Sequence, residues 1–222
     1  MKPHPIKADF HMHTRFSPDS QTAPQRLVAR CQERGLNLVA VTDHNTIAGA
    51  HAVARIAPFP VIIGAEVKTA DGDLIGLFLQ EEVPKGLSAV ETAKRIKAQG
   101  GLVFLPHPYD TVRRSVMRKS VLPDLLPLVD AVEGFNARNV FSGANTRALT
   151  LAREHRKPIV AVSDAHHPLE IGKTYTLLPF YEGTPESLLM ALREAVLVCR
   201  PSSPLVHGLT VWSKVLRRLG VA

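Results

Sequence analysis

The first apolar run of the sequence ends in a dense group of side chains that can bind metal. In "ADFHMHTRFSPDS", residues 8–20, His11 and His13 stand one residue apart and Asp19 follows a Ser-Pro turn. Residues i and i+2 of a strand point to the same face, so both imidazoles can reach one ion while Met12 faces away. Imidazole and carboxylate ligands without a thiolate suit Mn²⁺, Fe²⁺ or Zn²⁺. The segment therefore predicts part of a divalent-metal site.

Other apolar runs of the chain close in the same way, with metal-capable side chains. These are Asp43 and His44, then Glu66, then His107, and finally Asp164 with His166. Each stands at the carboxyl end of a predicted strand, where barrels and open α/β sheets alike assemble their sites. One H-x-H or D-x-H pair is more often incidental, but a whole series of such strand ends indicates a shared site. So many ligands exceed the needs of one ion, and we expect a cluster of two or three ions with a bridging carboxylate such as Glu66.

The elements that must position these residues follow an alternating order. Apolar runs of strand length cover residues 6–13, 36–44, 60–67, 73–79, 101–108, 130–136 and 158–166. Helices are predicted over 24–35, with Pro24 in the first turn, over 88–101, with Ser88 as N-cap, and over 144–155 and 185–197. This order is typical of a parallel α/β protein, and it fits a (β/α) barrel with one unit fewer than usual better than an open sheet.

Composition and charge narrow the class of protein. A chain of 222 residues with 45% hydrophobic residues can fill the core of a single barrel, and we expect this domain to cover residues 1–201. The start of the chain lacks the features of a signal peptide, and no apolar stretch is long enough to span a membrane, so a cytoplasmic location is predicted. The net charge of +7 would attract any anion, so it says little about whether the partner is a nucleic acid, a phosphorylated metabolite or an anionic lipid. Cys31 and Cys199 are expected to be buried free thiols.

The remaining residues, 202–222, form a predicted C-terminal tail. Leu209, Trp212, Leu216 and Leu219 recur there at helical spacing, and Lys214, Arg217 and Arg218 lie between them. The pattern predicts an amphipathic helix. Packing against the barrel is favoured over an oligomer contact or a contact with an anionic membrane, and the oligomeric state is left open.

An ordered set of motifs resembles a known family. The segments "HMHTRFSPDS", "VTDHNTIAGA", "IIGAEV", "LPHPYD" and "SDAHHPLEIG" together resemble the PHP (polymerase and histidinol phosphatase) family of metal-dependent phosphoesterases. The resemblance runs from about residue 8 to about residue 195, and "DAVEGFNARN" is similar to the small, stand-alone members. It implies a distorted (β/α)7 barrel that carries up to three divalent ions at its carboxyl rim.

The resemblance also implies a role for each ligand. The first ion would be held by His11, His13, Glu66 and Asp164. Glu66 would bridge to the second ion, which His107 binds. The third ion would be held by Asp19, His44 and His166. The second site departs from the family, because "VKTADGDLIGLFLQ" contains no histidine and the sixth strand offers Asn136. That site is expected to be weak, rich in water or completed by Asn136, so the choice between two and three ions stays open.

The predicted chemistry is hydrolysis of a small phosphorylated metabolite or nucleotide. A hydroxide bridged by the ions would attack the phosphate, and the ions would neutralise its charge. Either metal-bound water or His166 would protonate the leaving group. Phosphate would be gripped by arginines that follow the strand ends, namely Arg15, Arg113, Arg114 and Arg138.

Two other classes of function compete with this hypothesis. The first is a metal hydrolase that acts on another type of bond, such as an amide. The second is a module that processes or binds nucleic acid beside a polymerase. The second is less favoured, because the sequence shows no aromatic-rich basic stripe and no recognisable nucleic-acid motif.

Overall fold

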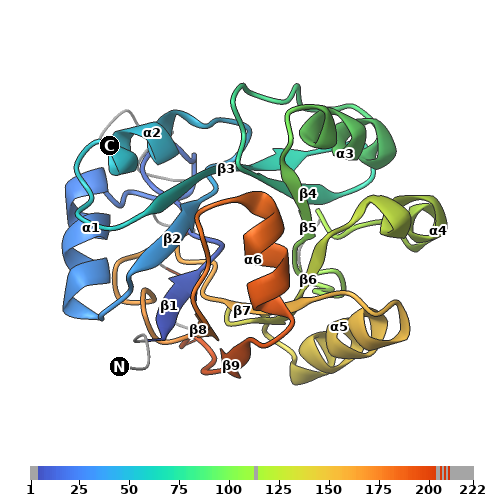
Figure 1. The fold of residues 1–222 in the computed structure, drawn as a ribbon. Coiled ribbons are helices and arrows are strands. Elements are labelled where there is room, and N and C mark those ends of the chain that lie inside the picture. The colour runs from blue at the N-terminus through green and yellow to red at the C-terminus, as the bar shows by residue number, and fades with distance from the viewer. Residues whose placement is uncertain (1–4, 113–114, 204–205, 207, 209, 211–222) are drawn as a thin grey trace.

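The structure is a computed structural model that describes residues 5–112, 115–203, 206, 208 and 210 (Figure 1). The strands are β1 (Ile6–Asp9), β2 (Leu38–Val41), β3 (Val61–Lys68), β4 (Asp73–Leu77), β5 (Leu102–Leu105), β6 (Ala131–Asn136), β7 (Ile159–Val162), β8 (Tyr175–Leu178) and β9 (Val196–Val198). The helices are α1 (Pro24–Glu33), α2 (Ala48–Ala54), α3 (Ala89–Ala98), α4 (Leu122–Leu125), α5 (Ser142–Glu154) and α6 (Pro185–Leu192). Short 3₁₀ turns, Lys119–Val121 and Leu126–Leu128, flank α4.

One sheet contains all of these strands, in the order β7-β6-β5-β4-β3-β2-β1-β8-β9. The first three strands pair in parallel, as do β5, β6 and β7. All the predicted apolar runs form strands of this sheet, which curls into a nearly closed, distorted barrel. The prediction missed β8 and β9. Strand β8 pairs antiparallel with β1, and β9 pairs antiparallel with β8.

The β3–β4 connection breaks the parallel pattern. Strand β4 pairs antiparallel with both of its neighbours, because residues 69–72 form a tight turn and a parallel return needs about a dozen residues. In this turn Thr69 N donates to Gly72 O at 3.0 Å. Gly72 has φ 143°, and a Cβ there would lie 2.5 Å from Met117 Cα, so no other residue fits. Strand β4 consequently begins at the rim of the barrel where β3 and β5 end.

The barrel closes through a few contacts rather than a full ladder. Residues just beyond β1 and β7 form an isolated parallel bridge between Met12 and Ala165. Between β7 and β8, the Thr176 hydroxyl accepts from Ala161 N at 2.9 Å and donates to Ala161 O at 3.0 Å. Asp9 Oδ1 accepts from Ser163 N at 3.1 Å. Beyond this bridge, side chains therefore take the place of main-chain pairing along the seam.

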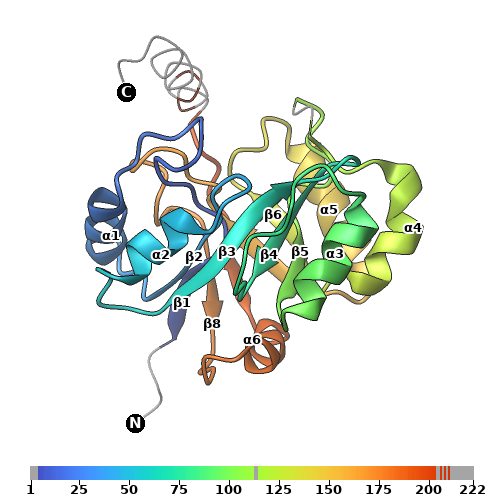
Figure 2. The ribbon, with the colours of Figure 1, turned by 90° about the horizontal axis from the view of Figure 1, so that it is seen from above.

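Three apolar clusters pack the fold. The interior of the barrel is filled by side chains such as Phe10, Phe104 and Ile75, and Leu188 and Leu192 of α6 belong to the same cluster. Figure 2 shows α6 at the end of the barrel where β1 begins. A second cluster lies under α1 and α2, and a third lies under α3 and α4. The two groups of helices lie on opposite sides of the barrel in both views.

Most helix predictions are confirmed. Ser88 caps α3 and its side chain accepts from Glu91 N at 3.2 Å. Helix α6 is shorter than predicted, because residues 196–198 leave the helix to pair with β8. Helices α2 and α4 were not predicted. The prediction for Cys199 is wrong: Cys31 is buried, but Cys199 is exposed.

The described part of the tail contacts the barrel. Ser202 N donates to Ala137 O at 2.8 Å, and Val206 is buried. The predicted apolar positions Leu209, Trp212, Leu216 and Leu219 lie outside the described residues, so the amphipathic helix stays a prediction. Among the helices that the structure describes, none combines the length and apolar character that crossing a bilayer requires.

Candidate metal centre

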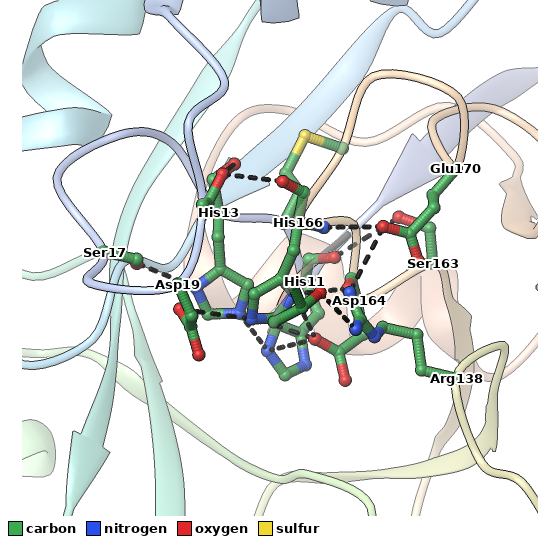
Figure 3. Close-up of polar contacts among 12 residues, drawn as sticks. His11, His13, Ser17, Asp19, Arg138, Ser163, Asp164, His166 and Glu170 are labelled. Carbon is green, nitrogen blue, oxygen red and sulfur yellow. Dashed lines mark hydrogen bonds and ion pairs between the residues drawn. The ribbon is translucent and has the colours of Figure 1, made fainter. Parts of the chain in front are cut away.

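The first strand delivers two imidazoles to one point, as its spacing predicts. His11 Nε2 and His13 Nε2 lie 3.0 Å apart in a fully buried position. Met12, between them, packs away from this point against Leu27 of α1 and Ala50 of α2. Figure 3 shows the rings of His11 and His13 converging with that of His166 and with the carboxylates of Asp19 and Asp164.

Each of these rings is held by its second nitrogen. His11 Nδ1 lies 2.6 Å from Glu133 Oε1, and His166 Nδ1 lies 2.9 Å from the carbonyl oxygen of Asp164. A carboxylate or carbonyl can only accept, so both Nδ1 atoms donate, and Nε2 is the nitrogen of each ring that remains for a metal ion. Contacts of this kind fix the tautomer and orientation of metal-binding histidines.

A hydroxyl network supports His13 in the same manner. Ser17 Oγ donates to Asp43 Oδ1 at 2.6 Å and can therefore accept from His13 Nδ1 at 3.0 Å. Asp43 also accepts from Thr14 N and from Thr14 Oγ1, at 2.8 and 2.6 Å. Asp43, which the sequence placed beside His44 at a strand end, thus organises the loop after β1. Its carbonyl oxygen also accepts from Glu66 N at 3.2 Å.

Glu66 on β3 lies at the middle of the group. Its carboxylate is 2.9 Å from His107 Nε2 and 3.1 Å from His44 Nδ1, and its Oε2 is 3.4 Å from His11 Nε2 and 3.5 Å from His13 Nε2. Its Oε2 is buried and has no hydrogen-bond partner among the described residues. A buried carboxylate oxygen surrounded by imidazole nitrogens fits a bridging ligand for divalent cations.

Two further carboxylates border this group. Asp19 lies between two rings, 3.4 Å from His44 Nε2 and 3.4 Å from His166 Nε2. Asp164 Oδ1 lies 3.6 Å from His11 Nε2 and 3.5 Å from His13 Nε2. The structure therefore brings all the predicted ligands together.

Three overlapping groups have ligand atoms within 4.8 Å of one another. They are His11, His13 and Glu66; His13, His44 and His166; and Glu66, Asp73 and His107. The first two groups lie within the ligand sets implied for the first and third ions, apart from His13 in the second. The third group contains Asp73, which was not predicted.

Electrostatics in the group favour a bound cation. Burial alone would lower the pKa of His11, but the carboxylates of Asp164, Glu133 and Glu66 outweigh it and raise this pKa well above its ordinary value. Burial also opposes protonation of His44, yet Glu66 and Asp19 raise its pKa in the same way. These carboxylates thus attract protons onto the rings of His11 and His44, and divalent ions can replace those protons.

Backbone strain stands at two of the predicted ligands. His107 has φ 26° and Asp164 has φ 51°, values that are uncommon for residues other than glycine. Such conformations cost about 1 to 3 kcal/mol and persist where the surroundings enforce them, often at functional sites. Glu133 Oε2 accepts from His107 N at 2.9 Å and helps to hold this conformation.

Sequence reasoning missed Glu133 and Asp73. Glu133 is 1% exposed and contacts His11, His107 and Asn136, but it lies inside the sixth apolar run rather than at its end. Asp73 opens the fourth run instead of closing it. A buried carboxylate inside an otherwise apolar strand was the available signal for Glu133.

The predicted arginines have different surroundings. Arg15 is exposed in the loop after β1. Arg138 is 4% exposed, and its guanidinium donates to Glu170 Oε2 at 3.2 Å and to Thr210 Oγ1 at 2.7 Å (Figure 3 shows the Glu170 pair). Arg113 and Arg114 lie outside the described residues. A role in phosphate binding therefore stays a prediction for all four.

The fold and the group of buried ligands define a class of metal-dependent barrel proteins. The "PHP domain" family matches residues 9–166, and the "PHP-associated" family matches residues 142–197. The chain belongs to the PHP domain family.

Relatives and solved structures agree with this assignment. MJ1587 of Methanocaldococcus jannaschii is 40% identical over 145 residues, which are 60% of this chain and 82% of that protein. A 5'-3' exoribonuclease of Haemophilus influenzae is 32% identical over 119 residues, 47% of this chain and 43% of that protein. The crystal structure of a two-domain Bacteroides vulgatus protein that contains a predicted PHP-like metal-dependent phosphoesterase gives a TM-score of 0.72 at 19% identity. That match covers 89% of this chain and 65% of the other.

Proposed function

We propose that the chain is a metal-dependent phosphoesterase that hydrolyses a small phosphorylated metabolite or nucleotide with two or three bound Mn, Fe or Zn ions. The observation that carries the proposal is the convergence of imidazole nitrogens and carboxylates on Glu66 in a buried space. Divalent ions held there would lower the pKa of water to about 7 and neutralise charge on a phosphate.

The residues divide the work of holding these ions. His11 and His13, with Asp164 Oδ1 within 3.6 Å of both rings, form the deepest set. Glu66 links this set to His107 and to His44. The rigid contacts of the rings with Glu133 and Ser17 keep each Nε2 directed at the centre, so little reorganisation precedes binding.

The structure bears on the choice of a proton donor. His166 Nδ1 is engaged by the carbonyl of Asp164, and His166 Nε2 faces Asp19 within the group. A ring that binds an ion through Nε2 and donates through Nδ1 has no proton on Nε2 to give to a leaving group. This geometry favours His166 as a ligand over His166 as the general acid.

The test is a comparison of bond types on the full chain. Metal-stripped protein would be reloaded with Mn²⁺, Fe²⁺ or Zn²⁺ and assayed for phosphate release from monoesters, for diester cleavage and for amide cleavage. We expect phosphate or a monoester to be released, and we expect Glu66→Gln prepared in parallel to lose bound metal and activity together. The proposal fails if the wild type releases neither phosphate nor a monoester faster than Glu66→Gln does, whereas amide cleavage alone would favour the competing hydrolase.

The similarity to a 5'-3' exoribonuclease supports a second candidate, the removal of nucleotides from the 5' end of RNA. A 5'-phosphorylated oligoribonucleotide in the same assay separates the two hypotheses. Shortening of the oligonucleotide at rates above those on small monoesters would favour the second candidate.

A further inference from the structure

Strand β4 brings a carboxylate to the metal centre that its parallel neighbours could not supply. Because β4 runs antiparallel to β3 and β5, its first residue, Asp73, lies at the rim where those strands end. The backbone of Asp73 is held there, since its N–H donates to Ser115 O at 2.9 Å. The preceding Gly72 packs directly on Met117. The position is therefore rigid.

The register of the hairpin aims Asp73 toward Glu66. Glu66 pairs directly with Ile75, so these two side chains share a face of the sheet. Asp73 stands two residues before Ile75 and lies on the same face, one step nearer the rim. Ile75 belongs to the apolar interior of the barrel, and Asp73 is therefore the residue of β4 on this face that can offer an oxygen.

The distances place Asp73 in a ligand group. An oxygen of Asp73, an oxygen of Glu66 and a nitrogen of His107 all lie within 4.8 Å of one another, and the three side chains are at most 5% exposed. His107 Nδ1 is buried and has no hydrogen-bond partner among the residues that the structure describes. Two buried carboxylates this close repel each other unless a proton or a cation lies between them.

Asn136, the other candidate for this position, is already engaged. Its Nδ2 donates to Glu133 Oε2 at 2.9 Å and to Asp164 Oδ2 at 3.0 Å. Its Oδ1 accepts from Arg138 N at 2.9 Å. The amide oxygen thus faces the backbone, and Asn136 orients neighbouring carboxylates instead of completing the second site.

We infer that Asp73, together with Glu66 and His107, holds the second ion in place of a histidine, and that this oxygen-rich site prefers Mn²⁺ to Zn²⁺. The inference rests on the proposed function, in that the centre must bind ions. Carboxylates suit Mn²⁺, whereas imidazoles suit Zn²⁺. The second site offers two carboxylates and one ring, in contrast to His13, His44 and His166 in the neighbouring group.

The experiment counts ions in the full chain. Metal-stripped wild type, Asp73→Asn and Asp73→His would be reloaded with Mn²⁺ and desalted, and Mn²⁺ per chain would be measured with the electron paramagnetic resonance spectrum. We expect Asp73→Asn to hold about one ion fewer and to lose the signal of spin-coupled ions that share a carboxylate. Asp73→His should regain the count with Zn²⁺ in preference to Mn²⁺.

The matched control is Asp71→Asn, which removes the same charge from the turn that precedes β4. Asp71 Oδ2 accepts from Ala89 N at 2.9 Å, and an Asn side chain retains an oxygen for this contact. The control should keep the wild-type ion count.

The outcomes separate the two hypotheses. Full ion content in Asp73→Asn would overturn the role of Asp73 and leave the proposed function standing. Less than one ion in the wild type would overturn both. If Asp73→Asn does not fold, Asp73→His decides the question, because an unchanged ratio of Zn²⁺ to Mn²⁺ in that variant would also overturn the inference.

Discussion

Glu133 should control metal affinity without binding an ion itself. Its Oε1 faces His11 Nδ1 at 2.6 Å, and its Oε2 accepts from His107 N and from Asn136 Nδ2, both at 2.9 Å. Both oxygens therefore face donors, and the side chain is 1% exposed, so water cannot substitute. In Glu133→Gln one of these oxygens becomes an NH₂ group.

Either orientation of that amide is unfavourable. If the amide nitrogen points toward His107, it faces two other donors, His107 N and Asn136 Nδ2. The backbone N–H of the strained residue His107 then loses its acceptor. With its nitrogen toward His11, the ring must accept at Nδ1, which moves the proton to Nε2 and blocks the metal-binding atom. Losing such a supporting partner costs about 10- to 100-fold in metal affinity, or about 1.4 to 2.7 kcal/mol at 25 °C.

The assay is a competition titration of Mn²⁺ against a chelator for the wild type, Glu133→Gln and Glu154→Gln. Glu154 is exposed at the end of α5, so its variant loses the same charge without touching the centre. The melting temperature of the metal-free proteins would be measured beside it. Mn²⁺ affinity in Glu133→Gln within twofold of the wild type would refute the reasoning, provided that this variant is folded.

Two other predictions concern packing and thiol chemistry. A Cβ at Gly49 would lie 1.8 Å from Asp43 Oδ2, so Gly49→Ala should lower the free energy of unfolding by roughly 1 to 3 kcal/mol in urea titrations. Gly143→Ala, with open space around it, should not lower it, and equal effects would contradict the argument. Burial raises the pKa of Cys31 to about 12, whereas Cys199 is exposed. A thiol reagent at pH 8 should therefore label native protein at Cys199 and reach Cys31 only after unfolding; rapid labelling of native Cys199→Ser would contradict this.

The sequence predicts much of the centre because parallel strands share a direction. Once β1, β2 and β3 are known to run side by side, the residues at their carboxyl ends must meet. His11, His13, His44 and Glu66 follow from that rule alone, and the structure brings the three rings within 3.5 Å of the Glu66 carboxylate.

Prediction from the sequence is limited where the direction of a strand, or the partner of a side chain, depends on residues that are distant along the chain. An apolar run such as 73–79 does not reveal whether its strand is parallel, so a search of strand ends passes over Asp73. The sequence also does not reveal that Glu170, distant along the chain, folds back to pair with Arg138. Tertiary contacts of this kind do not produce a periodic pattern in the sequence from which they could be predicted. A role of Arg138 in phosphate binding stays a prediction.

Bound ions should also stabilise the closed form of the barrel at its seam. His11 and His13 extend from β1, whereas Asp164 and His166 follow β7, and the strands flanking the gap are joined largely through Thr176, Asp9 and one bridge. Local opening at this gap would disperse the ligands, so ions that bind only the closed form must hold it shut. At a free ion concentration of 100 times the dissociation constant, the closed form gains about 2.7 kcal/mol. Amide hydrogens of β7 and β8 should then exchange about a hundredfold more slowly wherever exchange proceeds through that opening. The ions would then stabilise the closed barrel in addition to taking part in the reaction.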